Sequence, residues 1–269
     1  MMLSIRDLRV SFARERGPAA EVLHGIDLDL PKGRTLGIVG ESGSGKSVLS
    51  LAVMGLLPRS ATASGQVLLD GQDVLAMSER QLCGIRGRRI GMIFQEPMTA
   101  LNPAMRVGDQ IAEGLRITQG MPRADARAEA LRLLEMVRIP RASERIDSFP
   151  HQMSGGQRQR VGIAIALALK PDLLIADEPT TALDVTVQAE VLDILDDLVT
   201  ELGISLMLIS HDLGVIARIA DRTLVMYRGD RMEEGETEAV LRRPAHDYTR
   251  KLIAAMPRRV RASLEAPHG

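Results

Sequence analysis

Eight residues, Gly40 to Ser47, match the spacing G-x-x-x-x-G-K-[ST]. Glycines let successive backbone N–H groups turn toward one anion, and the positive end of a following helix strengthens that attraction. Lys46 is placed to reach the β- and γ-phosphates of a nucleotide, and the Ser47 hydroxyl is placed to bind Mg²⁺. The loop follows an apolar run and precedes a helical pattern, which is the context that a phosphate loop requires. The pattern therefore predicts that this segment holds nucleotide phosphates.

Two carboxylates, Asp177 and Glu178, follow directly after the apolar run Leu173–Ala176. Such a run is typical of a buried strand, and parallel sheets bind ligands at the carboxyl ends of their strands. Asp177 is therefore placed to support Mg²⁺, directly or through water, and Glu178 is placed to polarise an attacking water. The alternative is an acidic loop pair without a role, and the phosphate loop in the same chain argues against it.

A second glycine-rich helix start lies at Ser154-Gly155-Gly156-Gln157. Ser154 is a good N-cap, and the two glycines expose backbone N–H groups at the start of the helix. One interpretation is an ordinary helix start. The other is a second anion site, and it can serve the same nucleotide as the phosphate loop only if two molecules meet.

Three more side chains are candidates for the site. Gln95 follows the strand candidate Ile90–Phe94 and His211 follows Ser205–Ile209, so both are expected at the carboxyl ends of sheet strands. Gln95 offers an amide oxygen to Mg²⁺ or to the attacking water, and His211 offers a donor to the γ-phosphate. A structural role is the alternative for each. Phe12 offers a ring that can stack on adenine, although its position also fits a strand residue that faces a core.

The elements that position these residues form an α/β pattern. Alternating apolar residues in the first two strands, joined by a polar turn, predict an antiparallel hairpin. The stretch from Val107 to Leu169 contains no convincing strand and predicts an inserted helical subdomain. From Asp172 onward strands and helices alternate, which predicts a mostly parallel sheet covered by helices. Strands are expected at Leu3–Phe12, Val22–Leu30, Thr35–Val39, Val67–Leu69, Ile90–Phe94, Leu173–Ala176, Ser205–Ile209 and Arg222–Tyr227, and helices at Gly45–Leu57, Ser78–Gly84, Ala124–Val137, Val187–Leu202 and Leu213–Ala220.

Composition argues against several other functions. Aromatic residues make up 2% of the chain and the net charge is -1, so neither base stacking nor a basic field predicts a nucleic-acid partner. The longest apolar-rich runs, Val48–Leu57 and Val161–Leu169, are shorter than the roughly 18 residues of a membrane span. Any membrane role is therefore expected through a partner. The single cysteine, Cys83, permits no internal disulfide and fits a reducing compartment.

In this order the motifs resemble those of the ATPases of ABC transporters, and the resemblance covers nearly the whole chain. Gly40–Ser47 resembles the family's Walker A motif, Gln95 its Q-loop, Met153–Gln157 its signature motif, Leu173–Glu178 its Walker B motif with the catalytic glutamate, Ala182–Asp184 its D-loop and His211 its switch histidine. The resemblance implies a P-loop NTPase fold of α/β class with a mostly parallel sheet, an N-terminal antiparallel β-subdomain and an inserted α-helical subdomain. It also implies a head-to-tail dimer in which each signature motif closes over the other subunit's ATP.

The resemblance assigns roles to individual residues of this chain. It implies catalytic roles for Glu178, His211 and Gln95, and Mg²⁺ ligands at Ser47, Gln95 and Asp177. The ATP contacts that it implies are Phe12, Gly40, Glu41, Ser42, Gly43, Ser44, Gly45, Lys46, Ser47, Val48, Ser154, Gly155, Gly156, Gln157 and Asp184.

A finer resemblance points to the dipeptide, oligopeptide and nickel importers. It rests on Ile93–Pro103, on Phe149–Gln152, on Asp177–Gln188 and on Ala245–Arg250, which resembles that subfamily's C-terminal extension. Asp247 stands where the subfamily typically has proline, and Met153 replaces the commoner leucine of the signature. The further cysteines of many relatives are not matched, so an iron–sulfur role is not supported.

The resemblance implies an ATP-hydrolysing subunit that powers import of peptides, nickel chelates or related small solutes. Its expected partners are two transmembrane permease subunits, a second ABC ATPase of the same or a related kind, and indirectly an extracytoplasmic solute-binding protein. It is expected to be peripheral on the cytoplasmic face of the bacterial inner membrane. Residues 1–243 are expected to form the ATPase domain, with the helical subdomain at about 97–169, and residues 244–269 the extension. The alternatives are half of an exporter or a soluble ABC ATPase that acts on ribosomes or DNA.

Overall fold

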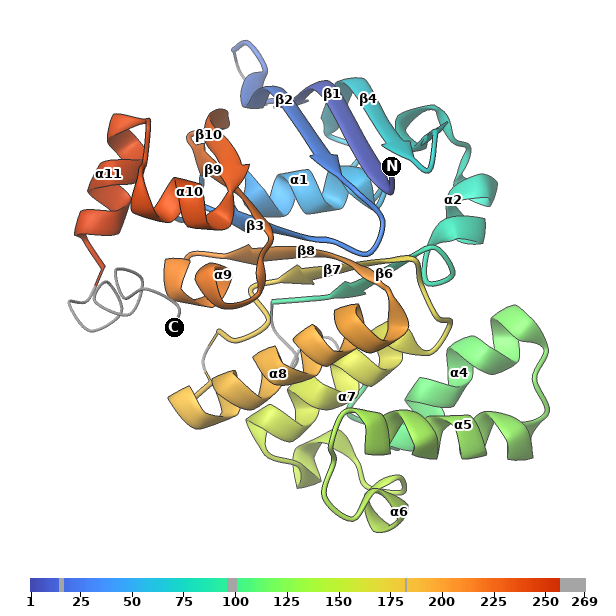
Figure 1. Ribbon diagram of the computed structural model, residues 1–269. Helices are drawn as coiled ribbons and strands as arrows, with labels where there is room; N and C mark the ends of the chain where they lie inside the picture. Colours follow the sequence, from blue (N-terminus) through green and yellow to red (C-terminus); the bar gives the residue numbers. More distant parts are fainter. Residues whose placement is uncertain (15–16, 96–100, 182, 257–269) are drawn as a thin grey trace. The chain divides into compact units, whose positions relative to one another are not determined.

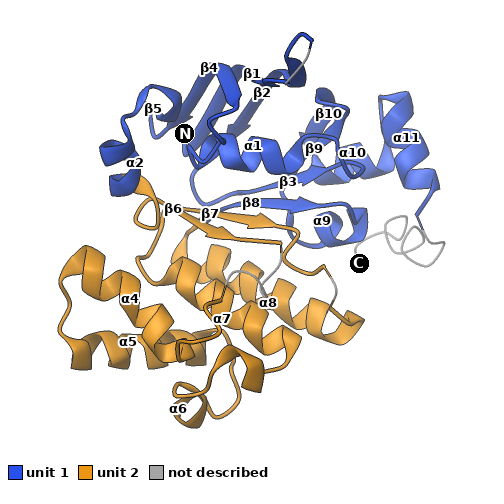
Figure 2. Cartoon of the chain, turned by 180° about the vertical axis from the view of Figure 1, so that it is seen from behind, with its two compact units in different colours: residues 1–84, 205–269 blue, residues 85–204 orange. Residues whose placement is uncertain are grey.

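A computed structural model describes residues 1–14, 17–95, 101–181 and 183–256 of the 269-residue chain. The chain forms two compact units (Figure 2). Unit 1 contains Met1–Gly84 and Ser205–Gly269, and unit 2 contains Ile85–Ile204. Within the described residues, no helix combines the length and the apolar character needed to cross a membrane. The domain boundaries expected from the sequence at 97–169, 243 and 244 remain predictions.

An antiparallel sheet forms the N-terminal part of unit 1 (Figure 1). Its strand order is β2-β1-β4-β5, and the predicted N-terminal hairpin is confirmed by the antiparallel pairing of β1 with β2. The strands are β1 (Leu3–Phe12), β2 (Ala20–Leu30), β4 (Ala61–Leu69) and β5 (Gln72–Asp73). The alternation of buried residues in β1 slips between Ile5 and Leu8, where the register shifts and Asp7 adopts a φ of 43°. The slip that is visible in the sequence is therefore a β-bulge.

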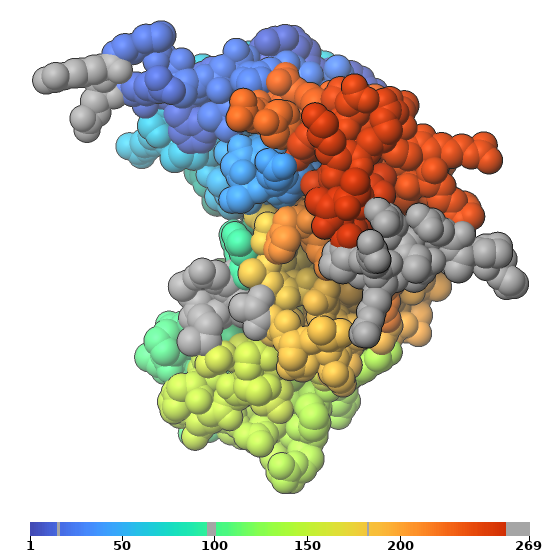
Figure 3. Space-filling view, turned by 90° about the vertical axis from the view of Figure 1, so that its left-hand side faces the viewer, coloured from blue at the N-terminus to red at the C-terminus, as the bar shows by residue number. Residues whose placement is uncertain are grey.

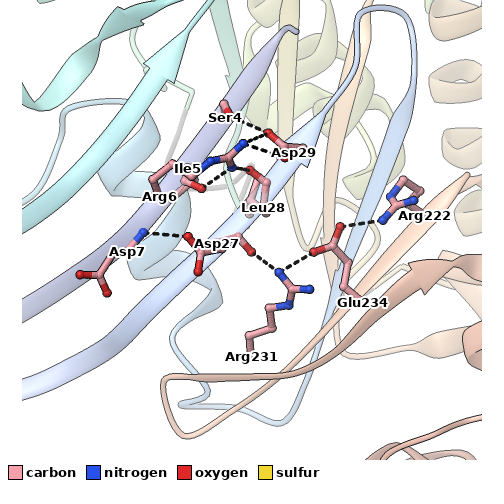
Figure 4. Close-up of polar contacts among 10 residues, drawn as sticks. All are labelled: Ser4, Ile5, Arg6, Asp7, Asp27, Leu28, Asp29, Arg222, Arg231 and Glu234. Carbon is pink, nitrogen blue, oxygen red and sulfur yellow. Dashed lines mark hydrogen bonds and ion pairs between the residues drawn. The ribbon is translucent and has the colours of Figure 1, made fainter.

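Polar contacts secure the bulge (Figure 4). The Asp7 N–H donates to Asp27 Oδ1 at 2.9 Å, and the Arg6 guanidinium donates to both carboxylate oxygens of Asp29 at 2.9 Å. Arg6 also donates to the Leu28 carbonyl at 3.2 Å. These contacts occupy groups that the bulge removes from the regular ladder, so the distortion does not leave them unpaired.

Parallel strands form the second sheet region of unit 1. Strand β3 lies between β8 and β9 and is parallel to both, and β10 is antiparallel to β9. Figure 1 shows helix α1 between the antiparallel sheet and β3. The elements are β3 (Thr35–Val39), α1 (Lys46–Val53), η1 (Val74–Ala76), α2 (Glu79–Ile85), β8 (Ser205–Ser210), α9 (Leu213–Ile219), β9 (Arg222–Tyr227), β10 (Asp230–Glu236), α10 (Thr237–Arg242) and α11 (Asp247–Ala254). All side chains of β3 and β8 are buried, as the apolar runs predict.

Unit 2 combines one parallel strand pair with helices. Strands β6 (Ile90–Ile93) and β7 (Leu173–Asp177) pair in parallel. The described residues between 101 and 169 contain no strand, which confirms the expectation for this stretch. The helices of unit 2 are α4 (Val107–Gln119), α5 (Arg123–Met136), α6 (Ala142–Arg145), η2 (Pro150–Gln152), α7 (Gly155–Leu167) and α8 (Val185–Leu202). The predicted α/β fold class with an antiparallel β-subdomain is thus confirmed.

Several element boundaries differ from the sequence-based expectation. Helix α1 ends at Val53 rather than Leu57, because Gly55 has a φ of 63° and ends the helical path. Strand β6 ends before Phe94, whose side chain is exposed. Strand β10 was not expected, because its sequence is largely polar. Its Glu234 is nevertheless buried and paired with Arg222 at 3.0 Å and Arg231 at 3.1 Å (Figure 4).

Candidate functional site

The backbone of the phosphate loop is fixed by close packing in unit 1. The loop joins β3 to α1, and Gly40 follows a strand whose five residues are all buried. A Cβ atom on Gly40 would lie 2.2 Å from the Met226 carbonyl oxygen. Gly43 and Gly45 have φ angles of 79° and 99°, which side chains rarely permit. Local geometry therefore requires glycine at all three positions.

Lys46 lies inside the loop rather than in solvent. Its side chain is only 5% exposed, and Nζ donates to the carbonyl oxygens of Gly40 at 2.7 Å and Glu41 at 2.9 Å. Helix α1 begins here with Gly45 as its N-cap and with no side-chain cap. Since the first N–H groups of a helix lack acceptors within the helix, this end presents uncapped donors beside a buried ammonium group. The arrangement suits a multiply charged anion.

Strand register places His211 at the same edge as the loop. In the parallel pair β3 and β8, Val39 is aligned with Ser210, so Gly40 and His211 are the next residues of the two strands. The His211 side chain is exposed. Behind it, Asp212 caps α9 by accepting from the Gly214 N–H at 2.7 Å. The structure therefore brings together His211 and the phosphate loop, as the sequence predicts for strand ends.

The other predicted residues of unit 1 lie at its surface. Ser47 is exposed in the first turn of α1, and the neighbouring Val48 is half-buried. Glu41, Ser42 and Gly43 are exposed, whereas Ser44 is buried. Phe12 ends β1, where it pairs with Ala20 and Ala61, and its ring is half-buried. That position leaves open both the stacking role and the structural role expected for Phe12.

In unit 2 the predicted acids and Gln95 meet at the ends of two parallel strands. Ile93 is aligned with Ala176 in the β6–β7 pair, so Gln95 and Glu178 leave the sheet at the same edge. The Gln95 Nε2 donates to Glu178 Oε2 at 3.2 Å. Glu178 has a φ of 47°, an uncommon conformation for a residue with a side chain. Such outliers often occur at functional sites.

A hydroxyl also orients Glu178. Thr181 Oγ1 donates to Glu178 Oε2 at 2.9 Å. The same oxygen therefore accepts from two side chains, which holds the carboxylate in one direction. Asp177, directly before it, is 5% exposed. One carboxylate of the pair is therefore buried and the other is oriented, and the two roles expected for them stay predictions.

The second glycine-rich helix start is capped by its own side chains. Ser154 Oγ accepts from the Gln157 N–H at 3.2 Å, and Gln157 Oε1 accepts from the Ser154 N–H at 3.1 Å. This is a capping box at the start of α7. A Cβ on Gly156 would lie 2.4 Å from Val187, whereas a Cβ on Gly155 would meet nothing closer than Leu183 at 4.0 Å. Packing therefore requires glycine at Gly156 but not at Gly155.

Asp184 has an observed structural role. Its Oδ1 accepts from the Val187 N–H at 3.0 Å and caps α8. The residue is exposed. The helix that it caps also carries Val187, which packs on Gly156, so the D-loop candidate and the signature candidate are joined through α8 within unit 2.

The predicted Mg²⁺ ligands are oxygen donors. The Ser47 hydroxyl, the Gln95 amide and the Asp177 carboxylate are the hard ligands that Mg²⁺ prefers, and Mg²⁺ usually takes few protein ligands together with water and substrate phosphates. Within the described residues no group of three or more His, Cys, Asp or Glu side chains could hold a metal ion. Oxygen donors of this kind fit a cation that arrives with a nucleotide.

Some predicted residues lie outside the described part of the chain, and some structural features were not predicted. Residues 96–100, Ala182 and residues 257–269 are not described, so the centre of the Q-loop segment, part of the D-loop and the end of the extension remain predictions. Met226 and Thr181 were missed, because their contacts with Gly40 and Glu178 depend on strand register or on the path of a loop. A hydroxyl three residues after Glu178 is the one signal that could have indicated Thr181.

Comparison with a protein-family model matches residues 23–181 to the family described as ABC transporter. The oligopeptide transport ATP-binding protein OppD of Bacillus subtilis is 48% identical over 258 residues, which are 95% of this chain and 72% of that protein. The dipeptide transport ATP-binding protein DppD of the same organism is 47% identical over 259 residues, 96% of this chain and 77% of that protein. The glutathione import ATP-binding protein GsiA of Salmonella typhimurium is 48% identical over 95% of this chain and 42% of its own length.

Solved structures give the same result for the fold. The ATP-binding cassette MJ0796, in a dimeric post-hydrolysis state bound to ADP and Pi, has a TM-score of 0.78 and 27% identity, covering 88% of this chain and 99% of that one. The cbiO1 protein of Clostridium perfringens, part of the ABC transporter complex cbiONQ, has a TM-score of 0.77 and 27% identity, covering 97% of this chain and 98% of that one.

Proposed function

The chain belongs to the ABC transporter family, and from this premise we propose that it hydrolyses ATP to power import of peptides or related small solutes. The phosphate loop carries the proposal, since Gly40–Ser47 combines the required backbone, an uncapped helix start and a buried lysine. The substrate class is supported by relatives at 47–48% identity that are named for oligopeptide, dipeptide and glutathione transport.

In this proposal Gly40–Ser47 holds the phosphates of ATP. Lys46 leaves the carbonyl oxygens of Gly40 and Glu41 and pairs with the β- and γ-phosphates, while the N–H groups of α1 donate to them. Ser47, Gln95 and Asp177 would hold Mg²⁺, which would supply positive charge to the phosphates. His211 donates to the γ-phosphate from the end of β8.

Glu178 polarises the water that attacks the γ-phosphate in line. Thr181 and Gln95 hold the carboxylate through hydrogen bonds of 2.9 and 3.2 Å. Holding the carboxylate in one orientation lowers the activation free energy of the attack by water without changing the charge of the carboxylate.

The site is completed by a second ATPase subunit of the same or a related kind. Ser154, Gly155, Gly156 and Gln157 of one subunit close over the ATP held by the other, in a head-to-tail dimer. The open space around Gly155 supports this role, because a phosphate can approach backbone that packing leaves accessible. A solved cassette with 27% identity is dimeric in a post-hydrolysis state.

The membrane partners are two permease subunits, supplied with solute by an extracytoplasmic binding protein. The ATPase is peripheral on the cytoplasmic face of the inner membrane, and the segment from Glu96 to Val107 receives the permeases. An importer requires genes for a binding protein and two permeases near the gene for this chain. Their absence would contradict import while leaving ATP hydrolysis intact.

The test of catalysis is Glu178→Gln in the full chain assembled with its membrane partners. We expect ATP turnover to fall by about 10²–10⁴-fold, the usual contribution of a general base, while ATP remains bound. The matched control is Glu201→Gln, which makes the same chemical change at an exposed position near the end of α8. Near-normal turnover by Glu178→Gln would refute the assignment of the base.

A further inference from the structure

The C-terminal helix α11 carries one of the two tyrosines of the chain, and the two tyrosines are in contact. The rings of Tyr248 in α11 and Tyr227 in β9 have centroids 4.4 Å apart and planes inclined at 35°. Both residues belong to unit 1, and Figure 3 shows the red C-terminal segment on the same face as the light-blue segment that contains α1. The contact joins the segment after β10, which contains α11, to strand β9.

Tyr227 begins the turn that packs on the phosphate loop. The next two residues, Arg228 and Gly229, have φ angles of 48° and 87° and connect β9 to β10 as a two-residue turn of the type that suits a hairpin. The Gly229 N–H donates to the Ser44 carbonyl at 3.1 Å. On the other side of Tyr227, the Met226 carbonyl lies against Gly40. The turn is thus held against the loop at Gly40 and at Ser44, with Tyr227 between the two contacts.

The start of α11 is itself held firmly. Glu233 of β10 accepts from the N–H groups of Ala245 at 2.8 Å and His246 at 3.0 Å. His246 Nδ1 accepts from the Tyr248 N–H at 3.1 Å and caps the helix. Arg250 donates to the carbonyl oxygens just before the helix, at 2.7 and 2.9 Å. Tyr248 therefore stands on a fixed first turn.

The Tyr248 hydroxyl faces the phosphate loop. Its oxygen atom is buried. Burial raises the pKa of Tyr248, and its charged neighbour there is Glu41 of the loop. The phenol therefore stays neutral at physiological pH, next to the residue whose carbonyl accepts from Lys46.

We propose that Tyr248 is a positioning residue for the phosphate loop. Its ring, packed against Tyr227, holds the β9–β10 turn against Gly40 and Ser44, so that α11 sets how well the loop is ordered for ATP. The inference rests on the proposed function of Gly40–Ser47 as the phosphate site. It assigns a role in ATP binding to a segment that lies after the ATPase domain expected from the sequence.

The first experiment measures binding of a ribose-labelled fluorescent ATP to the full chain. Tyr248→Ala is expected to weaken binding about three- to tenfold, the range for loss of one aromatic pair. Tyr248→Phe keeps the ring and is expected to stay within about twofold of the wild type, since the contact between the two rings carries the effect. The matched control is Ile253→Ala, which removes a half-buried side chain from the same helix. Thermal melting without nucleotide compares the stability of the variants.

Three outcomes would overturn the inference. Unchanged binding by Tyr248→Ala removes the positioning role. Equal weakening by Ile253→Ala shows that any loosening of α11 has the same effect, which is a purely structural role. Equal weakening by Tyr248→Phe assigns the effect to the hydroxyl rather than to the contact between the two rings.

A spectroscopic measurement needs no destabilising substitution. Because the chain has two tyrosines and no tryptophan, its tyrosine emission reports only on Tyr227 and Tyr248. We expect ATP to change this emission saturably, and AMP, which absorbs equally but lacks the β- and γ-phosphates, to leave it unchanged. Emission that responds to neither nucleotide would contradict the inference.

Lys46→Ala separates failure of the inference from failure of the proposed site. If Lys46→Ala abolishes ATP binding and Tyr248→Ala does not alter it, only the role of Tyr248 is wrong. If Lys46→Ala binds ATP normally, the phosphate site itself is wrong, and the inference falls with it.

Discussion

The two glycine-rich helix starts of this chain differ in how their first N–H groups are satisfied. Helix α1 begins at Gly45 with no side-chain cap and with a buried lysine beside it. Helix α7 begins at Ser154 with a complete capping box formed by Ser154 and Gln157. The start of α1 leaves its N–H groups available to an external anion, whereas the start of α7 satisfies some of its N–H groups with its own side chains. We therefore propose that α1 binds phosphate within one chain and that α7 contributes only when a nucleotide is brought to it.

The glycines of the two starts differ as well. Gly40 faces backbone, since its Cβ would lie 2.2 Å from the Met226 carbonyl oxygen. Gly156 faces the Val187 side chain, and Gly155 faces open space. Substitutions at these positions therefore distinguish glycine that the fold requires from glycine that a ligand requires.

The largest effect is expected for Lys46→Ala at the uncapped start. Loss of a buried charge that contacts the phosphates should lower ATP turnover by at least about 10²–10³-fold, the usual effect of losing one stabilising donor. ATPase assays on the assembled transporter measure this. Lys32→Ala serves as the control, because its 2.9 Å ion pair with Asp70 is exposed and contributes little. Equal ATPase activity of Lys46→Ala and Lys32→Ala would contradict phosphate binding at the start of α1.

The next effect concerns the stability of the loop. Gly40→Ala should destabilise unit 1 by about 3 kcal/mol, the upper range for overpacking, because backbone cannot move aside. Gly43→Ala has open space but a φ of 79°, so a cost of about 1–2 kcal/mol is expected from the left-handed conformation alone. Urea unfolding, monitored by circular dichroism, compares the free energies of unfolding of the two variants. The reverse order would show that the loop is not fixed by β9.

The sequence predicted more of the fold than of its supporting contacts. Apolar runs and turn residues were sufficient for the strands β3, β7, β8 and β9, and the motifs identified the family that the comparisons show. Strand β10 was missed because its buried Glu234 is compensated by Arg222 of the neighbouring strand β9 and by Arg231 of β10 itself, contacts that a hydrophobic pattern does not show. The Tyr227–Tyr248 pair was missed for the same reason. The assigned roles of the site residues are still predictions.

A smaller effect is expected for Ser154→Ala at the capped start. Loss of the N-cap should destabilise α7 by about 1 kcal/mol, and α1 offers no equivalent substitution because Gly45 has no side chain. Thermal unfolding of the full chain measures the change. Ser143→Ala, at an exposed position within α6, is the control. An unchanged melting temperature would show that the capping box contributes nothing.

The smallest effect concerns the start of a third helix, α11, where the carboxylate of Glu233 holds the residues before the helix. Burial works against the ionised form of Glu233, but interactions with the Thr249 side chain and with the N–H groups of Ala245 and His246 outweigh it and lower the Glu233 pKa. This contribution to stability is present above the unfolded-state pKa of about 4.3 and is lost as pH falls through the lower folded-state value. Melting temperatures should therefore fall less steeply in acid for Glu233→Gln than for the wild type. Parallel curves would contradict the anchoring role.

The central claim is that the phosphate loop of one subunit and the signature of another form one catalytic site. Gly155→Asp tests it directly, because the side chain enters open space and an acidic residue is favourable at a helix start. The account predicts ATP affinity of the isolated chain within about twofold of the wild type, and turnover in the assembled transporter lower by at least about 100-fold through repulsion of the phosphates. Normal turnover, or a loss of affinity equal to that of Lys46→Ala, would contradict it.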